Sequence, residues 1–439
     1  MSRARSLWLF VSVFLLALGG GSFVGCKKDS SPTGPGGGAG SVVNVTGKVI
    51  GVNGQPAAGV PVYVAGKPSV NSDANGAFTI ASVTVPYDIT VVNGGTKQAY
   101  IYRGISRSDP TLVFIAFTAG TANAATISGN IYPTSAYPQP ATRRTSLAFI
   151  SPEVAVNAAP NGTVSPATYT KALAWYGPSS TVGTLHALQW DIDASSLPTT
   201  YQRYGSRSGV TVTNGGTFAN MNDTMSATPG TVTLSGTVTA AAGYTIASKA
   251  ILAQFGGTTA FPLASESNAA SAFSYKTPDI SGLTVVLQAT AVKTGFGDAV
   301  AFKAGVAPNG TGVSLTVPAA PELSLPVDAA TGVKAGAPFS WSPFAGGMQI
   351  LYFNGPAGQP DIYVMTMAAS DSLPNLTSAG LPIPASTTYQ WSVVAFGPFA
   401  SMDAATGPGG FIPAGYITGL VQGSGNLGES VSRTFTTAP

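Results

Sequence analysis

Apolar and polar side chains alternate along much of this 439-residue chain, and this alternation is what most restricts the fold. Val43, Val45 and Val49 fall on one side of an extended backbone, whereas Thr46 and Lys48 fall on the other. A period of two is that of a β-strand with one buried face. Similar runs recur between turn residues, and no segment after the N-terminal apolar run combines helical spacing with capping residues. The pattern predicts an all-β protein.

The composition supports the same fold class. Only 8% of the residues are charged, against roughly 25% in typical proteins, and there are 54 glycines. β-branched residues favour strands and glycine favours turns, so this composition is typical of exported all-β proteins. The charges are few and scattered, which excludes a nucleic-acid-binding face. A single cysteine permits no internal disulfide, so each domain needs an ordinary hydrophobic core.

The N-terminus has the organisation of a secretory signal peptide. Arg3 and Arg5 precede an apolar run from Leu7 to Leu18, and small residues lead to Cys26. The apolar run is shorter than the ~20 residues that cross a bilayer as a helix. An uncleaved anchor remains the alternative, because the run can be extended as far as Gly25. Removal of residues 1–25 takes away both arginines and no acid, which leaves a nearly neutral chain.

Phe23-Val24-Gly25-Cys26 resembles the lipobox of bacterial lipoproteins, although Phe23 stands where that family prefers leucine. The resemblance implies that Cys26 is lipidated and becomes the first residue of the mature chain. Acyl chains there would hold the protein in a membrane of the bacterial cell envelope, with the outer membrane or cell surface as the expected location. Residues 26–42 are polar and rich in glycine and proline, which predicts a flexible linker.

Residues 43–118 resemble a carboxypeptidase regulatory-like domain, a small transthyretin-like β-sandwich. The resemblance depends on the stretches 46–49, 59–62 and 72–78, the last of which reads Ser-Asp-Ala-Asn-Gly-Ala-Phe. Gly76 permits a left-handed turn there, and Phe78 is expected to enter the core. These are structural motifs, and they imply no peptidase activity.

Parts of this pattern recur later in the chain. Residues 231–318 are interpreted as a degenerate carboxypeptidase regulatory-like domain, because Leu234–Val238 repeats the opening strand and Ala272-Phe273 stands where Ala77-Phe78 stood. Residues 119–230 match mainly at Thr126–Gly129, so they are assigned to a β-sandwich whose class stays open.

Residues 319–439 resemble a fibronectin type III domain. Trp341 matches a core tryptophan of that family, and Tyr389 and Trp391 match its penultimate strand, whose tyrosine often ties a corner of the sandwich. A long insertion, 397–430, separates the last two strands. Together the four assignments predict tandem Ig-like or transthyretin-like β-sandwiches that follow one another in a row, with the last one distal to the membrane.

The insertion offers one candidate binding surface. It carries apolar side chains, including Phe399, Phe411 and Tyr416, that are suited to docking a partner. The alternatives are that it folds back over the sandwich or forms a hairpin at 416–422. A second candidate is the aromatic pair Trp175 and Tyr176, with Trp190, because exposed rings can stack on sugars; burial in a core is the competing interpretation.

Other motifs favour structural roles. The stretch 71–76 imitates a calcium loop, but Ser82 occupies the position of the required glutamate, so a hairpin turn is expected. His186 is the single histidine and cannot form a multi-histidine metal site. Asp191 and Asp193 are interpreted as strand-end acids rather than as an acid pair or a weak cation site. Neither a metal nor a cofactor is predicted.

The arginine pairs are interpreted as solvated charges that protect strand edges, and they are Arg103 with Arg107, Arg143 with Arg144, and Arg203 with Arg207. The resulting hypothesis is a non-catalytic, membrane-anchored lipoprotein that acts as an envelope scaffold or as a binding or adhesion protein. Its expected partners are the membrane, through lipid on Cys26, and a protein or polysaccharide ligand. Carbohydrate binding is the alternative, and a hydrolase is the least favoured reading.

Overall fold

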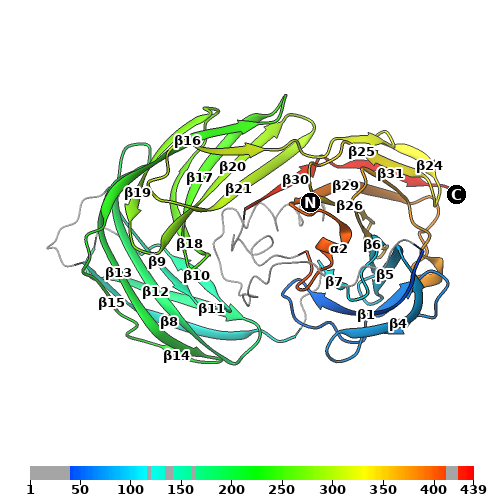
Figure 1. Ribbon diagram of the computed structural model, residues 1–439, viewed down its shortest axis with the longest axis horizontal. Coiled ribbons are helices and arrows are strands. Elements are labelled where there is room, and N and C mark those ends of the chain that lie inside the picture. Colours follow the sequence, from blue (N-terminus) through cyan, green and yellow to red (C-terminus); the bar gives the residue numbers. More distant parts are fainter. Residues whose placement is uncertain (1–39, 116–119, 134–141, 161–163, 412–423) are drawn as a thin grey trace.

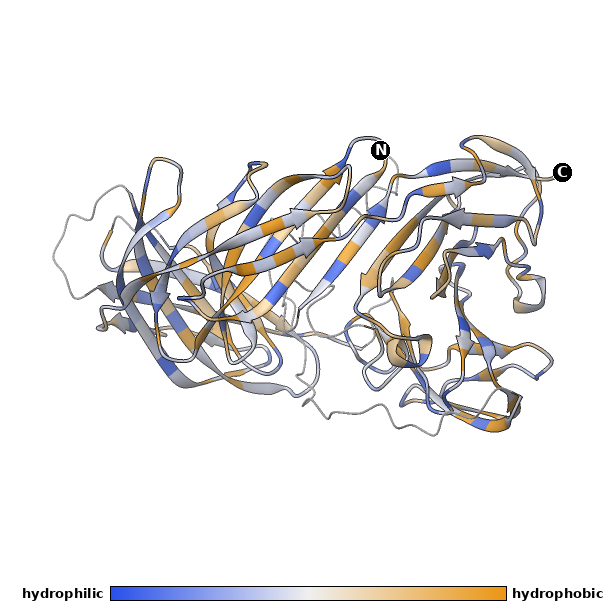
Figure 2. Ribbon diagram, turned by 45° about the horizontal axis from the view of Figure 1, so that its top comes forward, coloured by the Kyte–Doolittle hydropathy of each residue, from blue (hydrophilic) through white to orange (hydrophobic). Residues whose placement is uncertain are grey.

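The computed structural model describes residues 40–115, 120–133, 142–160, 164–411 and 424–439, and these residues form an all-β protein (Figure 1). Their helical content is limited to the single-turn segments η1 (Thr377–Ala379) and α2 (Met402–Ala405). Apolar and polar residues alternate along many of the strands (Figure 2), as the period-two pattern predicts. The predicted fold class is therefore confirmed. Cys26 and the predicted linker up to residue 39 lie outside the described residues.

The first unit is a sandwich of two sheets. Its strands are β1 (Val42–Gly51), β2 (Pro61–Val64), β3 (Val70–Asn71), β4 (Ala77–Thr84), β5 (Tyr87–Asn93), β6 (Gln98–Ile105) and β7 (Thr111–Phe114). One sheet has the order β4-β1-β7, with β7 parallel to β1, and the other has the order β6-β5-β2-β3. Gly47 lies opposite Phe78, whose ring occupies the space that a Cβ at position 47 would need.

The same strand order occurs twice more. The second unit comprises β8 (Asn123–Pro133), β9 (Arg143–Ile150), β10 (Ala155–Ala158), β11 (Ala167–Trp175), β12 (Ser180–Ile192), β13 (Pro198–Thr213), β14 (Thr217–Phe218) and β15 (Asp223–Met225). The third comprises β16 (Gly230–Ala240), β17 (Thr245–Phe255), β18 (Thr258–Glu266), β19 (Ala272–Asp279), β20 (Leu283–Lys293), β21 (Gly297–Val306) and β22 (Val313–Val317).

In each of these units the first strand pairs antiparallel with the fourth and parallel with the last. The other four strands form the orders β10-β9-β12-β13 and β18-β17-β20-β21. A glycine of the first strand is the register partner of an aromatic residue of the fourth in all three units, as Gly129 is of Tyr169 and Gly236 is of Phe273. Residues 123–225, whose class the sequence left open, thus share the topology of their neighbours.

The C-terminal unit has a different arrangement. Its strands are β23 (Leu323–Leu325), β24 (Ala330–Val333), β25 (Pro338–Trp341), β26 (Met348–Asn354), β27 (Asp361–Thr366), β28 (Ser370–Ser372), β29 (Thr388–Gly397), β30 (Gly425–Ser430) and β31 (Arg433–Thr437). The order β23-β25-β28 forms one sheet, and β27, β26, β29 and β31 form the other face. β30 comes from the predicted insertion, which therefore contains a strand.

Tyr389 differs from the expectation attached to it. Its ring is fully buried and stacks on Phe435, with 5.6 Å between the ring centroids. However, its hydroxyl has no hydrogen-bond partner among the described residues, so it does not tie a corner of the sandwich there. The position of Tyr389 in the core follows from the alternation of β29, whereas a corner bond depends on where a distant loop places its backbone.

The units are not separate sandwiches in a row, which corrects the arrangement expected from the sequence. A 14-stranded sheet runs through three of them. Twelve of its strands follow the order β18-β17-β20-β21-β30-β29-β26-β27-β6-β5-β2-β3, and the other two lie off this path, where β31 pairs with β29 and β24 pairs with β31. β27 pairs in parallel with β6 of the first unit, and β30 pairs antiparallel with β21 of the third. The C-terminal unit therefore lies beside the first unit, on the right of Figure 1, while the second and third lie on the left.

The hydrophobic cores also extend across unit boundaries. Val394 and Met365 of the C-terminal unit belong to the core cluster of the first unit, and Ile101 of the first unit belongs to the core of the C-terminal unit. Leu188 and Trp190 of the second unit pack into the core of the third. The chain thus folds as two bodies, one built from its two end units and one from its two middle units, and the sheet pairing of β21 with β30 connects them.

Candidate functional site

The predicted insertion packs against the first unit. Ser401 caps α2 by accepting a hydrogen bond from the Ala404 amide, and Met402 and Phe411 are buried in the first unit's core. Phe411 is only 2% exposed and lies 6.4 Å from the ring of Tyr102. Phe411 is therefore not available to a ligand, and folding back is the correct alternative for it. Phe399 is partly buried against the same core, and Tyr416 lies outside the described residues, as does the hairpin predicted at 416–422.

Polar contacts reinforce this packing. Asp403 Oδ1 accepts hydrogen bonds from the backbone amides of Ser106, at 2.7 Å, and Arg107, at 3.0 Å. Arg107 Nη1 donates to the Asp403 carbonyl at 2.9 Å. Arg103 pairs with Asp371 at 3.0 Å and with Asp88 at 2.7 Å. We call these five residues, Arg103, Ser106, Arg107, Asp371 and Asp403, the terminal clasp, because they join the first unit to the last.

The aromatic candidates in the second unit are core residues for the most part. Trp175 has no exposed surface, and its Nε1 donates to the Pro178 carbonyl at 2.8 Å. Trp190 is 6% exposed and packs near Tyr201, whereas Tyr176 is half-buried. Stacking on a sugar requires an open ring face. Trp175 and Trp190 lack one, so burial in a core is the correct interpretation for these two tryptophans.

His186 lies at the junction of the second and third units. Its ring stacks on Phe255 at 4.0 Å between centroids, and its Nδ1 is 2.9 Å from the Tyr204 hydroxyl. Burial lowers the pKa of His186 to about 4, so the imidazole is neutral at neutral pH. These contacts make His186 a packing residue between the units.

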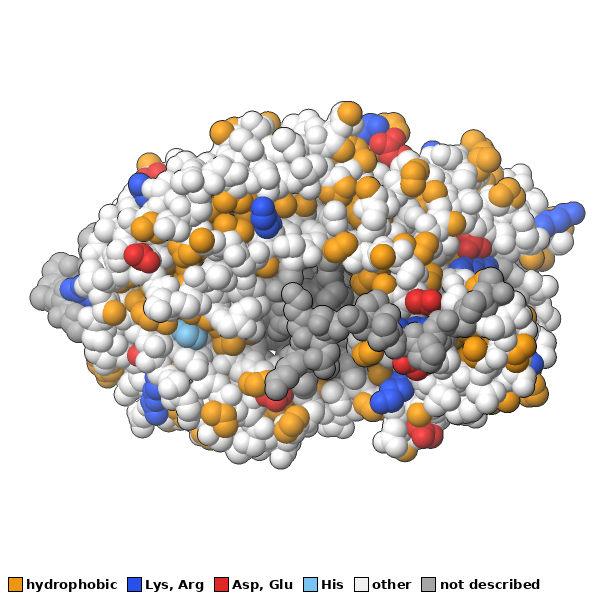
Figure 3. Space-filling view, in the orientation of Figure 1, with side chains coloured by type: hydrophobic (Ala, Val, Ile, Leu, Met, Phe, Trp, Pro, Cys, Tyr) orange, Lys and Arg blue, Asp and Glu red, His pale blue; other side chains and the backbone are white. Residues whose placement is uncertain are grey.

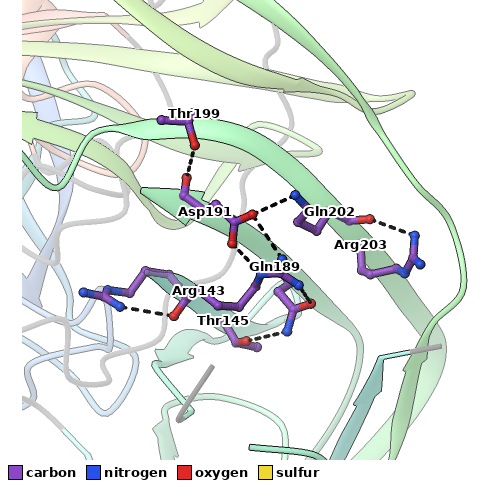
Figure 4. Close-up of polar contacts among 8 residues, drawn as sticks. Arg143, Thr145, Gln189, Asp191, Thr199, Gln202 and Arg203 are labelled. Carbon is purple, nitrogen blue, oxygen red and sulfur yellow. Dashed lines mark hydrogen bonds and ion pairs between the residues drawn. The ribbon is translucent and has the colours of Figure 1, made fainter. Parts of the chain in front are cut away.

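Asp191 and Asp193 have separate structural roles. Arg143 binds Asp191 with two hydrogen bonds, from Nε at 2.5 Å and from Nη2 at 3.1 Å, and Gln202 adds a third at 2.8 Å (Figure 4). Gln189 contributes to the same network through Arg143 Nη1. Asp193 instead accepts from the backbone of its own turn. The two carboxylates therefore do not act together.

The stretch that imitates a calcium loop is a hairpin turn. Asp73 Oδ1 accepts hydrogen bonds from the amides of Asn75 and Ala77, both at 2.8 Å. Gly76 has φ +72°, and a Cβ there would lie 2.3 Å from the Val49 carbonyl oxygen. Within the described ranges, no group of three or more His, Cys, Asp or Glu side chains is positioned to hold a metal ion.

The sequence predicts solvated arginine pairs at strand edges, but Arg107 and Arg143 are buried, so this prediction is wrong for these two side chains. Arg103, Arg107 and Arg143 are each engaged with an aspartate, and Arg203 donates to Thr228. On the face drawn in Figure 3 the charged side chains are few, and the basic ones do not gather into a patch.

A cavity of about 240 Å³ lies where β21 meets β30, and sequence reasoning did not find it. Its lining includes Lys293, Asp298 and Glu429, of which the two acids are direct partners across the strand pair. Burial, and secondly the charge of Asp298, raises the pKa of Glu429 to about 7. Lys293 is engaged with Glu322 at 2.6 Å. No local motif predicts this pairing, because β21 and β30 are more than a hundred residues apart in the chain.

A second unpredicted cluster lies in the third unit around Lys249. This side chain has no exposed surface, and its Nζ is 2.7 Å from Asn268 Oδ1, 2.6 Å from the Ala270 carbonyl oxygen and 3.2 Å from Glu266 Oε1. Tyr275, on the facing sheet, donates to Glu266 Oε1 at 2.7 Å. The alternation of β17 contained a signal, since position 249 shares its face with the buried Ile251.

Over the described residues, no helix has the length and apolar character needed to cross a bilayer. No protein-family model and no curated protein matches the sequence. Among solved structures, the chain is similar to two B repeat units of the collagen-binding protein of Staphylococcus aureus, at 12% identity and a TM-score of 0.15, over 80% of this chain and 92% of that one.

The tandem repeats of a large adhesion protein align at 11% identity and a TM-score of 0.14, over 90% of this chain and 99% of theirs. The major pilin subunit BcpA of Bacillus cereus aligns at 10% identity and a TM-score of 0.13, over 63% and 99%. Identities and TM-scores this low carry no functional inference. The description of this protein as all-β is based on its own strands and sheets.

Proposed function

We propose that this chain is a lipid-anchored lipoprotein of the bacterial cell envelope, and that it serves as a non-catalytic scaffold or binding protein. The anchor is Cys26, whose surroundings resemble a lipobox. The fold supports a mechanical role, since Arg103, Arg143 and Lys249 are engaged in ion pairs within the protein. The resemblance of the end units to carboxypeptidase regulatory-like and fibronectin type III domains is consistent with this role, since both are structural modules.

The terminal clasp is the main structural support for the proposed orientation on the membrane. It joins the first unit, which directly follows the linker, to the C-terminal unit. With the linker treated as a flexible coil, its 15 residues from 27 to 41 reach roughly 20 Å. Both end units therefore lie near the membrane, and the second and third units are presented outward. This arrangement differs from the one expected from the sequence, in which the C-terminal unit was distal.

The anchor is tested by comparing the full-length protein with a Cys26→Ser variant. The parent is expected in the membrane fraction, with an intact mass that starts at Cys26 and includes acyl chains. The variant is expected to leave the membrane fraction. A parent protein that retains residues 1–25 and a free thiol at Cys26 would refute lipidation.

The orientation is tested by protease treatment of whole cells or of outer-membrane vesicles. Cleavage within the second and third units, before any cleavage in the first or last unit, is the expected order. Protection of the second unit with early loss of the C-terminal unit would contradict the proposed orientation while leaving lipidation intact.

A further inference from the structure

The Lys249 cluster places an amine, a carboxamide and a carboxylate in one enclosed corner of the third unit. The amine is fully buried, and its Nζ hydrogen-bonds Asn268 Oδ1 at 2.7 Å. The carboxamide carbon therefore lies only one C=O bond, ~1.2 Å, beyond the contacted oxygen. Glu266 contacts both partners, at 3.2 Å from Lys249 Nζ and 3.0 Å from Asn268 Nδ2.

We propose that Lys249 and Asn268 react to form a side-chain amide bond, with Glu266 as the catalytic base. A nucleophile, a base within hydrogen-bond reach and a third group that orients the base are the features of an activated nucleophile. Tyr275 is the orienting group here, since its hydroxyl donates to Glu266 Oε1 at 2.7 Å.

The reaction is balanced in atoms and electrons, and it needs no further reactant. Glu266 takes one proton from the Lys249 ammonium, and the neutral Nζ attacks Cγ of Asn268 to form the new C–N bond. The C–Nδ2 bond then breaks, and Nδ2 leaves as ammonia with a second proton that came from Nζ. The proton on Glu266 passes to water or to the ammonia. Neither oxidation nor reduction occurs.

The surroundings suit each step. Glu266 must be ionised to accept a proton; burial raises its pKa, but the hydrogen bonds from Tyr275, Lys249 and Asn268 outweigh burial and hold the pKa below its ordinary value. The fold holds the buried amine of Lys249 beside the carboxamide of Asn268, so the two groups do not have to meet by diffusion before they react. Asn268 itself is exposed at the end of β18, so the ammonia has a direct route to solvent.

The product would join β17 to the residues that follow β18. Lys249 and Glu266 are already partners across this strand pair, so the bond would close a loop between neighbouring strands of the third unit. Such a cross-link restricts the unfolded chain in the way that a disulfide does, in a protein whose single cysteine permits none.

Tryptic digestion of the full-length protein tests this directly. Trypsin cleaves after arginine and lysine, and between Arg207 and Lys276 the sequence contains one such residue, Lys249. An unlinked protein yields peptides 208–249 and 250–276. A linked protein resists cleavage after Lys249 and yields a single peptide, 208–276, that is lighter than its sequence by one ammonia.

The expected result is the single lighter peptide in the parent and the two ordinary peptides in Glu266→Gln and Asn268→Ala. Glu266→Gln keeps the size of the side chain, so circular dichroism should show a folded protein that lacks the bond. Lys171→Met, at another lysine on a strand, is the matched control and should retain the lighter peptide. Two full-mass peptides from the folded parent protein would overturn the proposal, as would an unchanged bond in Glu266→Gln.

Discussion

Replacing Glu429 with glutamine is expected to remove a large part of the pH dependence of stability. Glu429 faces Asp298 across the β21–β30 pairing that connects the two bodies of the protein. Neither acid forms an ion pair with another described residue. Burial and the neighbouring charge raise the pKa of Glu429 from 4.5 to about 7. The folded protein therefore holds a proton that the unfolded chain releases at lower pH.

The sign and the size of the effect follow from this difference. Below pH 4.5 the carboxyl is protonated in both states, so it does not change the free energy of unfolding. Between pH 4.5 and about 7 the unfolded chain has released this proton while the folded protein still holds it, so the free energy of unfolding falls across this range and levels off above it. One pKa unit corresponds to ~1.4 kcal/mol, so the rise from 4.5 to about 7 corresponds to about 3 kcal/mol lost by the parent protein.

Urea denaturation of the full-length parent and of Glu429→Gln, at about pH 5 and about pH 8, measures this difference. The free energy of unfolding of the parent should fall by about 2.5 kcal/mol more than that of the variant between the two pH values, because a part of the full effect is already lost at pH 5. Asp298→Asn should give a smaller change of the same sign, because it removes the charge but not the burial. Asp279→Asn, at an exposed position on β19, is the control and should behave like the parent. Equal pH dependence in the parent and Glu429→Gln would refute the reasoning.

Three further predictions concern packing and charge. Phe411→Ala should lower the free energy of unfolding by about 3–5 kcal/mol, measured by urea denaturation, while Phe296→Ala, at a side chain that is 42% exposed, should change it little. Asp371→Asn should lower the free energy of unfolding by ~1 kcal/mol, because it removes the ion pair with Arg103 in the terminal clasp. A double-mutant cycle with Arg103→Gln that shows no coupling energy would contradict this. As the pH falls from 6.5 to about 4, the His186→Phe variant should gain stability relative to the parent by ~3 kcal/mol at most, because burial disfavours the protonated imidazole of the parent. Parallel curves of unfolding free energy against pH for the two proteins would contradict this.

Much of the local structure could be predicted from sequence. The alternation of Val43, Val45 and Val49 predicted a strand, the repeat at 234–238 predicted another, and Tyr389 and Trp391 were matched to a third; these residues lie in β1, β16 and β29. The motif that ends in Gly76 and Phe78 predicted a turn and a buried ring, and both are present. These predictions succeed because side-chain period and turn geometry are local properties of the chain.

The functional expectations depended on burial, and alternation alone does not specify burial. Trp175 lies on the same face of β11 as the buried Tyr169 and Leu173, and only the folded molecule shows that its surface is fully covered. Phe411 lies in a segment without repeat, and only its contact with the core of the first unit shows that it is not a ligand contact. A side chain's neighbours from other units decide its exposure.

Order along the chain thus set the strands and the turns, because each depends on neighbouring residues. The pairing of β6 with β27 and of β21 with β30 was decided only by the folded molecule, since strand edges pair through backbone amides and carbonyls that are the same for nearly every residue. The same contacts place Glu429 against Asp298 and Lys249 against Asn268, and the chemistry of both pairs depends on distance and burial.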